Sequence, residues 1–205
     1  MRGKDIWDEK YAAKELVWSA IPTEEFVKKV QHLTPGKALD VACGEGRNAI
    51  YLAEKRWDVT AVDFSKVAIE KARLIAEKRS VDVNWVVADA SKYPFAENEY
   101  DLVGVMYLHN SKQEQSRWLP AVIKSVATGG TFVYIGHDRT NIQYGVGGPQ
   151  DPSVLLSIGE TLELLKDFEI EQAEVIERPY ADETGHGGAP EMMALDAIIC
   201  AKKRG

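Results

Sequence analysis

Short apolar segments alternate with helical segments through the middle of this chain, and this alternation constrains its fold more than any other feature. The apolar segments have the length and residue types of buried strands, and they lie at 38–42, 59–63, 83–88, 100–107 and 131–137. Helical patterns occupy 47–55, 66–79 and 113–127, and Gly129 and Gly130 are expected to end the third helix. Strands separated by such helices predict an α/β fold with a doubly wound, mostly parallel sheet.

The two ends of the chain have different patterns. Residues 5–33 predict two helices broken at Pro22, the second capped by Thr23. Residues 168–178 and 192–201 predict two strands with no helix between them, and therefore an antiparallel hairpin that completes the sheet. We expect a single domain over residues 1–205. It consists of an N-terminal helical cap, residues 1–34, and a Rossmann-like core, residues 35–205.

Composition excludes several classes of partner. The chain has 205 residues, a net charge of -7 and a pI near 5.2, which argues against a nucleic-acid or anionic membrane surface. It has only two cysteines, Cys43 and Cys200, at no metal-ligand spacing, which favours a reducing compartment. No apolar run has the length of a membrane span, and the charged start does not resemble a signal peptide. We expect a cytoplasmic protein with a small-molecule partner, no metal, and an oligomeric state that the sequence leaves open.

A glycine-containing loop follows the first predicted strand. Gly44 and Gly46 allow a ligand to approach the backbone closely, and the next helix begins there with unpaired N–H groups. With Ala49 these glycines also satisfy the fingerprint of NAD-binding folds. Asp63 ends the second strand, where its carboxylate is placed to accept hydrogen bonds from the ribose hydroxyls of NAD or of another nucleotide-like ligand. The loop therefore predicts a nucleotide-like ligand without identifying it.

Two further carboxylates favour S-adenosylmethionine over NAD. Asp40 lies inside the first strand, where it can face the amino-acid end of a cofactor, and NAD has no amine there. Asp89 follows the third strand, where it can accept from an adenine amino group. The alternative is structural, with Asp40 satisfied by backbone donors and Asp63 or Asp89 capping a helix.

At these residues the chain resembles the seven-stranded class I methyltransferases, over roughly 38–135. The run from Gly44 to Asn48 is most similar to tellurite-resistance methyltransferases. Trp7, Tyr11 and Trp18 resemble the aromatic N-terminal lid of thiopurine and thiol methyltransferases, although a hydrophobic stripe packed on the core is an equal alternative. Ala42 departs from the family pattern, which usually has a glycine there.

The resemblance implies the strand order 3-2-1-4-5-7-6 and an N-terminal helical lid. It also implies that the chain binds S-adenosylmethionine and releases S-adenosylhomocysteine. The residues expected to bind this cofactor are Trp7, Tyr11, Asp40, Ala42, Cys43, Gly44, Gly46, Arg47, Asn48, Asp63, Phe64, Ser65, Asp89, Ala90 and Met106.

The methyl acceptor is expected just beyond the carboxyl ends of the strands. His109 and His137 follow the fourth and fifth strands, and each is a candidate general base or a residue that only shapes the pocket. Asp138 is expected to cap its loop rather than orient His137. We favour simple alignment over base catalysis, because no other acidic residue pairs with either histidine by sequence spacing. Further pocket candidates are Tyr107, Tyr144, His186 and a glycine-containing lid at 139–152.

The expected reaction is methyl transfer to a thiol, a chalcogen oxyanion or a small aromatic or heterocyclic compound. Two alternatives remain at this point. An NAD-dependent oxidoreductase would leave Asp40 and Asp89 without a role, and a non-catalytic S-adenosylmethionine-binding module would act through a partner.

Overall fold

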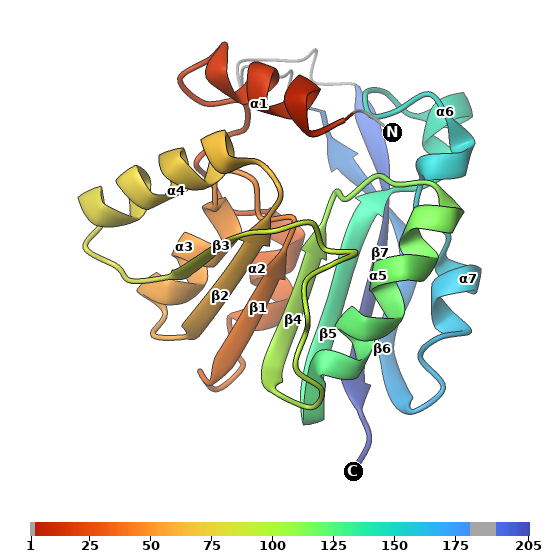
Figure 1. Cartoon of the computed structure of the whole chain (residues 1–205). Helices are drawn as coiled ribbons and strands as arrows, with labels where there is room; N and C mark the ends of the chain where they lie inside the picture. The colour runs from red at the N-terminus through yellow and green to blue at the C-terminus, as the bar shows by residue number, and fades with distance from the viewer. Residues whose placement is uncertain (1–2, 181–191) are drawn as a thin grey trace.

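A computed structural model of the chain describes residues 3–180 and 192–205. Its centre is a seven-stranded sheet in the order β3-β2-β1-β4-β5-β7-β6, which is the order that the resemblance to class I methyltransferases implied (Figure 1). The strands are β1 (Lys37–Val41), β2 (Asp58–Asp63), β3 (Asn84–Val87), β4 (Tyr100–Met106), β5 (Val126–His137), β6 (Phe168–Pro179) and β7 (Met193–Lys203).

The sheet is parallel through its first five strands and antiparallel at its end. β1 pairs in parallel with β2 and β4, β2 with β3, and β4 with β5. β7 then lies antiparallel between β5 and β6. The predicted hairpin is therefore confirmed. In the register between β5 and β7, His137, the last residue of β5, lies opposite Asp196.

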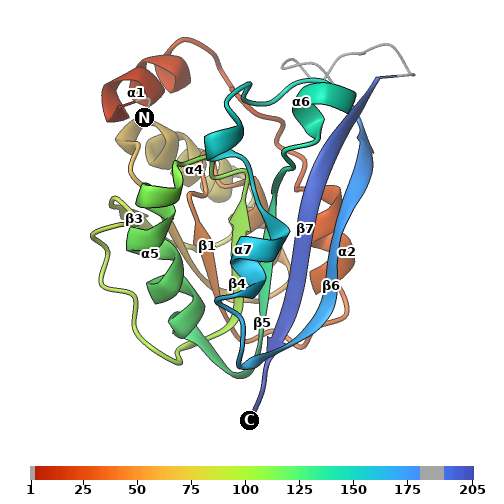
Figure 2. The same ribbon diagram turned by 90° about the vertical axis from the view of Figure 1, so that its right-hand side faces the viewer.

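Helices cover both faces of the sheet (Figure 2). Side chains of α2, α3 and α4 share one buried cluster with the sheet, and side chains of α5 share the other. This arrangement follows from the amphipathic patterns of the helices, whose apolar faces pack on the strands. The helices are α1 (Lys4–Ala12), α2 (Glu24–Val30), α3 (Arg47–Glu54), α4 (Lys66–Lys78), α5 (Lys112–Ser125), α6 (Asn141–Tyr144), α7 (Ile158–Leu162) and the 3-10 turn Pro152–Val154.

The expected end of α5 at Gly129 and Gly130 was wrong. The helix ends at Ser125, and Val126 already belongs to β5, where it pairs with Tyr100. Both glycines lie inside the strand, and a Cβ on Gly130 would stand 2.9 Å from the carbonyl oxygen of Tyr100. Gly130 therefore permits a close approach of two strands instead of ending a helix.

Within residues 3–180 and 192–205, no helix is both long and apolar enough to cross a lipid bilayer.

Candidate functional site

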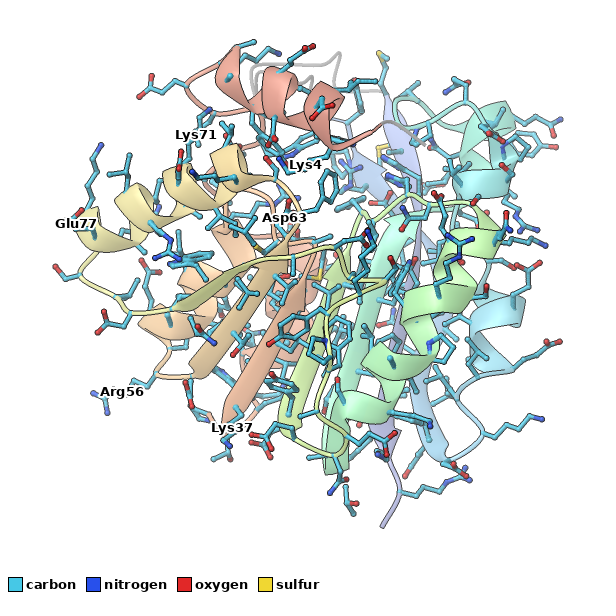
Figure 3. The ribbon with its side chains drawn as sticks, in the orientation of Figure 1. Lys4, Lys37, Arg56, Asp63, Lys71 and Glu77 are labelled. Atoms are coloured by element: carbon cyan, nitrogen blue, oxygen red, sulfur yellow. The ribbon has the colours of Figure 1, made fainter. Side chains whose placement is uncertain are left out.

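The loop after β1 is fixed by the carboxylate of Asp63 at the end of β2. One Asp63 oxygen accepts a hydrogen bond from the backbone N–H of Gly44 at 2.9 Å, and the other accepts from that of Ser65 at 2.8 Å. Figure 3 shows Asp63 at the upper end of β2, below α1. Burial raises the pKa of Asp63 despite these bonds. Asp63 thus connects the first two strand ends at the edge where the cofactor was expected.

Asp40 is buried in β1 with part of its carboxylate unpaired. The backbone N–H of Ala49 bonds to the carboxylate, but no described residue is within hydrogen-bond geometry of Oδ2. Burial raises the pKa of Asp40 to about 7. A buried unpaired oxygen costs free energy unless a ligand or water satisfies it, so this atom is the clearest opening for a ligand group.

Arg47 and Asn48, next to the loop, have different surroundings. The Arg47 guanidinium lies near Asp40 and Tyr107, and its pKa is lowered mainly by burial. Asn48 instead accepts a hydrogen bond through Oδ1 from the backbone N–H of Thr23 at 2.8 Å. Arg47 is therefore available to a ligand carboxylate near Asp40, whereas the Asn48 side chain anchors the start of α2.

The departure at Ala42 has a conformational consequence. Ala42 has a φ of 57°, in the left-handed region that favours glycine. The family's usual glycine would adopt this conformation without strain.

We predict that Ala42→Gly stabilises the protein by about 0.5–1 kcal/mol, because relief of left-handed strain exceeds the greater freedom of glycine in the unfolded chain. Chemical denaturation measures the change. Ala53→Gly in α3 is the matched control, and it should destabilise by roughly 1 kcal/mol. A less stable Ala42→Gly protein would show that the methyl group's packing outweighs the strain.

The N-terminal segment lies over the glycine loop. The buried Tyr11 ring places its hydroxyl 2.9 Å from where a Cβ on Gly44 would stand, and Trp18 Nε1 donates to that hydroxyl at 3.3 Å. Trp7 packs on both rings, with centroids 5.8 Å from Tyr11 and 6.3 Å from Trp18. Tyr11 and Trp7 belong to a small cluster with Val17, Val67 and Ala68 that is separate from the two main cores, and Trp18 lies at its exposed edge. That separation favours the lid over a stripe packed on the main core, and the lid stays a prediction.

Glu45 and Lys71 hold this segment in place. The buried Glu45 carboxylate accepts from the backbone N–H groups of Val17 at 3.0 Å and Trp18 at 3.1 Å. Lys71 of α4 lies 3.4 Å from the same carboxylate and donates to the backbone carbonyl of Tyr11. Asp8 adds a contact to the hydroxyl of Ser65. Sequence reasoning did not single out Glu45, although it is the one acidic side chain inside the glycine loop.

We predict that Glu45→Gln loosens the N-terminal segment, because an amide cannot accept from two backbone donors and pair with Lys71 as a carboxylate does. Amide hydrogen exchange in residues 14–20 should accelerate at least about tenfold, with a stability loss of ~1–3 kcal/mol. The exposed Glu70→Gln on α4 is the matched control, since Glu70 forms a surface ion pair with Lys66 at 3.5 Å. Equal exchange in the two variants would contradict the assigned role.

The other expected cofactor residues lie around the same edge with less specific contacts. Cys43 and Met106 are buried, while Phe64 and Ala90 are partly buried. Ser65 caps α4 by accepting from the N–H of Ala68. Asp89 is exposed, and its Oδ1 accepts from the N–H and the hydroxyl of Ser91, so its side chain closes a local turn.

The two candidate histidines do meet on the substrate side. His109 and His137 stack with centroids 5.3 Å apart and an interplanar angle of 8°. The Tyr107 ring lies 5.3 Å from His137. Burial, followed by the charge of His137, lowers the pKa of His109 to about 4, and His109 Nε2 is buried with no hydrogen-bond partner among the described residues.

Two other candidates have different surroundings. Tyr144 is 71% exposed, and its place in the pocket stays a prediction. Asp138 accepts from the N–H and hydroxyl of Thr140, and therefore caps its loop as expected. His186 falls outside the described residues.

Sequence reasoning missed Asp196 and Arg178, which come from the hairpin. Asp196 Oδ1 lies 2.9 Å from His137 Nδ1. Asp196 Oδ2 accepts from Tyr107 Oη at 2.7 Å and from Arg178 Nε at 2.6 Å. A signal was present, since Asp196 is the one acidic residue in β7 and lies in a run that is otherwise apolar from Met193 to Ala201. His137 thus has the acidic partner whose apparent lack led us to favour simple alignment.

The segment at 139–152 is tied to the hairpin. Asn141 is buried, accepts from the N–H of Leu195 at 2.7 Å, and donates to the carbonyl of Gly147 at 2.9 Å. Val146 donates its N–H to the carbonyl of Met193 at 3.1 Å. Gly148 lies against His137, so that a Cβ there would be 2.5 Å from the ring. These contacts hold the segment against the hairpin and place Gly148 beside His137.

The known proteins to which this chain is similar in sequence include methyltransferases. A family model described as a methyltransferase domain matches residues 38–130. Demethylmenaquinone methyltransferase of Renibacterium salmoninarum is 30% identical over 100 residues, covering 48% of this chain and 40% of that protein. The probable S-adenosyl-L-methionine-dependent methyltransferase TehB of Haemophilus influenzae is 28% identical over 120 residues, covering 58% and 40% respectively. The chain thus matches about two fifths of the length of these relatives.

Structural similarity extends over nearly the whole chain. A solved structure described as "Conversion of a Disulfide Bond into a Thioacetal Group during Echinomycin Biosynthesis" superposes with a TM-score of 0.76. It is 19% identical and covers 98% of this chain and 93% of its own. At that identity the likeness concerns the fold.

Proposed function

We propose that this chain is a class I S-adenosylmethionine-dependent methyltransferase that transfers the methyl group of this cofactor to a small-molecule acceptor. The match of a methyltransferase-domain model to residues 38–130 and the similarity to TehB support this proposal. The acceptor atom belongs to a thiol, a chalcogen oxyanion or a small aromatic or heterocyclic compound. The demethylmenaquinone and TehB relatives support the reaction class. The chain matches only 40% of the length of each, so the acceptor has to be found by experiment. The single-domain organisation and the cytoplasmic location remain predictions.

The unpaired, buried Oδ2 of Asp40 is the observation that carries this proposal. It lies in the strand that leads into the glycine loop, and the partly buried guanidinium of Arg47 is nearby. A carboxylate and a guanidinium at one place complement the ammonium and carboxylate groups of an amino acid. S-adenosylmethionine has that amino-acid end and NAD lacks it, so the charges favour a methyltransferase over an oxidoreductase.

Each part of the chain would then have a defined role. When bound, the cofactor supplies an electrophilic methyl group on a sulfonium. Asp63 would accept from the ribose hydroxyls with lone pairs not used by Gly44 and Ser65, and Tyr11 with its neighbours would exclude water above the loop. His109 and His137 would border the acceptor, which must be aligned with the methyl group.

A binding comparison followed by an acceptor screen tests the proposal. Calorimetry should show that S-adenosylmethionine and S-adenosylhomocysteine bind, while NAD does not. Release of S-adenosylhomocysteine is then measured with thiols, phenols, amines and oxyanions. Binding without release for every acceptor class would favour the non-catalytic module, and binding of NAD alone would favour an oxidoreductase.

A further inference from the structure

Asp196 is a buried carboxylate that remains charged. Its neighbours along β7 from Met193 to Ala201 are apolar, and burial alone would raise its pKa. The contacts with His137 and Arg178 outweigh that effect and lower the pKa of Asp196 to about 2. Oδ2 is taken by Tyr107 and Arg178, which leaves Oδ1 to face His137. An anion in this position stabilises positive charge on the imidazole ring.

The sheet itself creates this arrangement. His137 ends β5 directly opposite Asp196 of β7, so their side chains lie on the same face. Ile176 of β6 is opposite Asp196 on the other side, which makes Arg178 a diagonal neighbour on that face. Tyr107 follows β4, and its N–H bonds to the carbonyl of Ile135 in β5. Four neighbouring segments of the sheet therefore each contribute one residue to this cluster of polar and charged side chains. The pairing of the strands sets the geometry of the cluster.

The contacts distinguish the two nitrogens of His137. Nδ1 is 2.9 Å from Asp196, although its N–H is not aimed well enough to form a hydrogen bond in this conformation. Catalytic hydrogen bonds commonly tighten only when ligands are bound. A proton on Nδ1 leaves the lone pair on Nε2, at the ring edge beside Gly148. The charged or titratable groups facing the ring are Tyr107, His109, Asp196 and, through Asp196, Arg178.

His109 is unsuited to accept a proton. Its burial and the proximity of His137 disfavour its charged form, as its lowered pKa of about 4 indicates. A neutral, flat ring stacked on His137 instead provides a wall for a planar compound. The surroundings therefore separate the roles of two histidines that the sequence treats as equivalent.

We propose that Asp196, held by Tyr107 and Arg178, is a positioning residue that makes His137 Nε2 the proton acceptor, and that the methyl acceptor is an aromatic hydroxyl compound. This inference rests on the proposed methyl transfer. The hydroxyl oxygen forms a bond to the methyl carbon while the carbon–sulfur bond breaks and its electron pair stays on sulfur. The hydroxyl proton passes to His137 Nε2 and is later released to solvent. An anionic sulfur or oxyanion acceptor would not need this base.

Asp196→Asn makes a specific test because the donors fix the orientation of the amide. Tyr107 and Arg178 both donate to Oδ2, so the amide oxygen must occupy that position and the NH₂ group must face His137. An NH₂ group requires a lone pair on Nδ1, which places the proton on Nε2 and blocks it as an acceptor. Nitrogen-15 NMR of the full chain should show His137 protonated at Nδ1 in the wild type and at Nε2 in Asp196→Asn.

Kinetics provides the second readout, with a phenol and the corresponding thiophenol as acceptors. For the phenol, kcat should fall roughly 10²–10⁴-fold in Asp196→Asn and His137→Gln, with KM and cofactor affinity little changed. The thiophenol, already ionised at neutral pH, should lose less than about tenfold. Asp138→Asn is the matched control, since that carboxylate only caps its loop. His137→Gln removes no buried charge, so it tests the assignment even if Asp196→Asn unfolds.

The outcomes separate the inference from the proposed function. Equal phenol turnover in wild type, Asp196→Asn and His137→Gln would overturn the inference while leaving methyl transfer intact. An Nε2–H tautomer of His137 in the wild type would also overturn it. If the wild type methylates no acceptor at all, the proposed function fails, and the tautomer measurement still tests the role of Asp196.

Discussion

Asp40→Asn should weaken S-adenosylmethionine binding at pH 8 by at least about tenfold and remove most of its pH dependence between pH 6 and 8. The pKa of Asp40 in the folded protein is about 7, so its carboxylate becomes charged across this interval. A charged carboxylate attracts the cofactor's ammonium, and a neutral acid or amide attracts it less. Wild-type affinity should therefore rise from pH 6 to pH 8, as calorimetry at both pH values would measure.

The same substitution should change stability in the opposite direction. The folded-state pKa of Asp40 is raised from 3.8, so the stability gained from the neutral form is complete below about pH 4 and is lost as pH rises through about 7. Asp40→Asn avoids this loss and should be more stable than wild type at pH 8, by up to about 4 kcal/mol. Asp58→Asn, at the exposed start of β2, is the control. Unchanged stability and affinity at both pH values would contradict the roles assigned to Asp40.

Asp63→Ala should reduce cofactor affinity by ~1.5–3 kcal/mol, the scale of hydrogen bonds to a charged acceptor. The structure adds a second effect, because Asp63 also accepts from the N–H groups of Gly44 and Ser65. Hydrogen exchange at these two amides in the cofactor-free protein measures the loosening of the loop. Calorimetry with S-adenosylhomocysteine measures the total loss of affinity.

A cofactor analogue separates the two effects of Asp63→Ala. S-adenosylhomocysteine lacking both ribose hydroxyls should bind more weakly than the parent compound to wild type. The two compounds should bind almost equally to Asp63→Ala. If the variant discriminates between them as strongly as wild type does, Asp63 shapes the loop but does not contact the ribose.

Most of the sheet could be predicted because its signals are local. The apolar segments and the helices between them predict parallel strands, and the absence of a helix between the last two strands predicts the hairpin. The error at Gly129 and Gly130 arose from a non-local effect, since α5 ends two residues before the predicted end at residue 127 and Val126 pairs with Tyr100 in the sheet. Tertiary contacts overrode the local preference.

The candidate site was predictable on its parallel side and much less so at the hairpin. Asp40 and Asp63 were recognisable because each is close in sequence to a strand end or the glycine loop. The pairing of Asp196 with His137 depends on the register between β5 and β7, which joins residues far apart in the chain. The contact of Glu45 with the N-terminal segment is likewise non-local. Glu45 is 28 positions from Val17 and 27 positions from Trp18 in the sequence.

Transfer of a labelled methyl group is the most direct test of the central claim. The full chain would be incubated with cofactor deuterated at its S-methyl group and with each acceptor of the screen, and the products analysed by mass spectrometry. We expect the intact deuterated methyl group on the acceptor, S-adenosylhomocysteine in equal amount, and much lower yields of both with Asp63→Ala. Cofactor that binds tightly but returns unchanged, with no label on any acceptor, would contradict the assignment of this protein as a small-molecule methyltransferase.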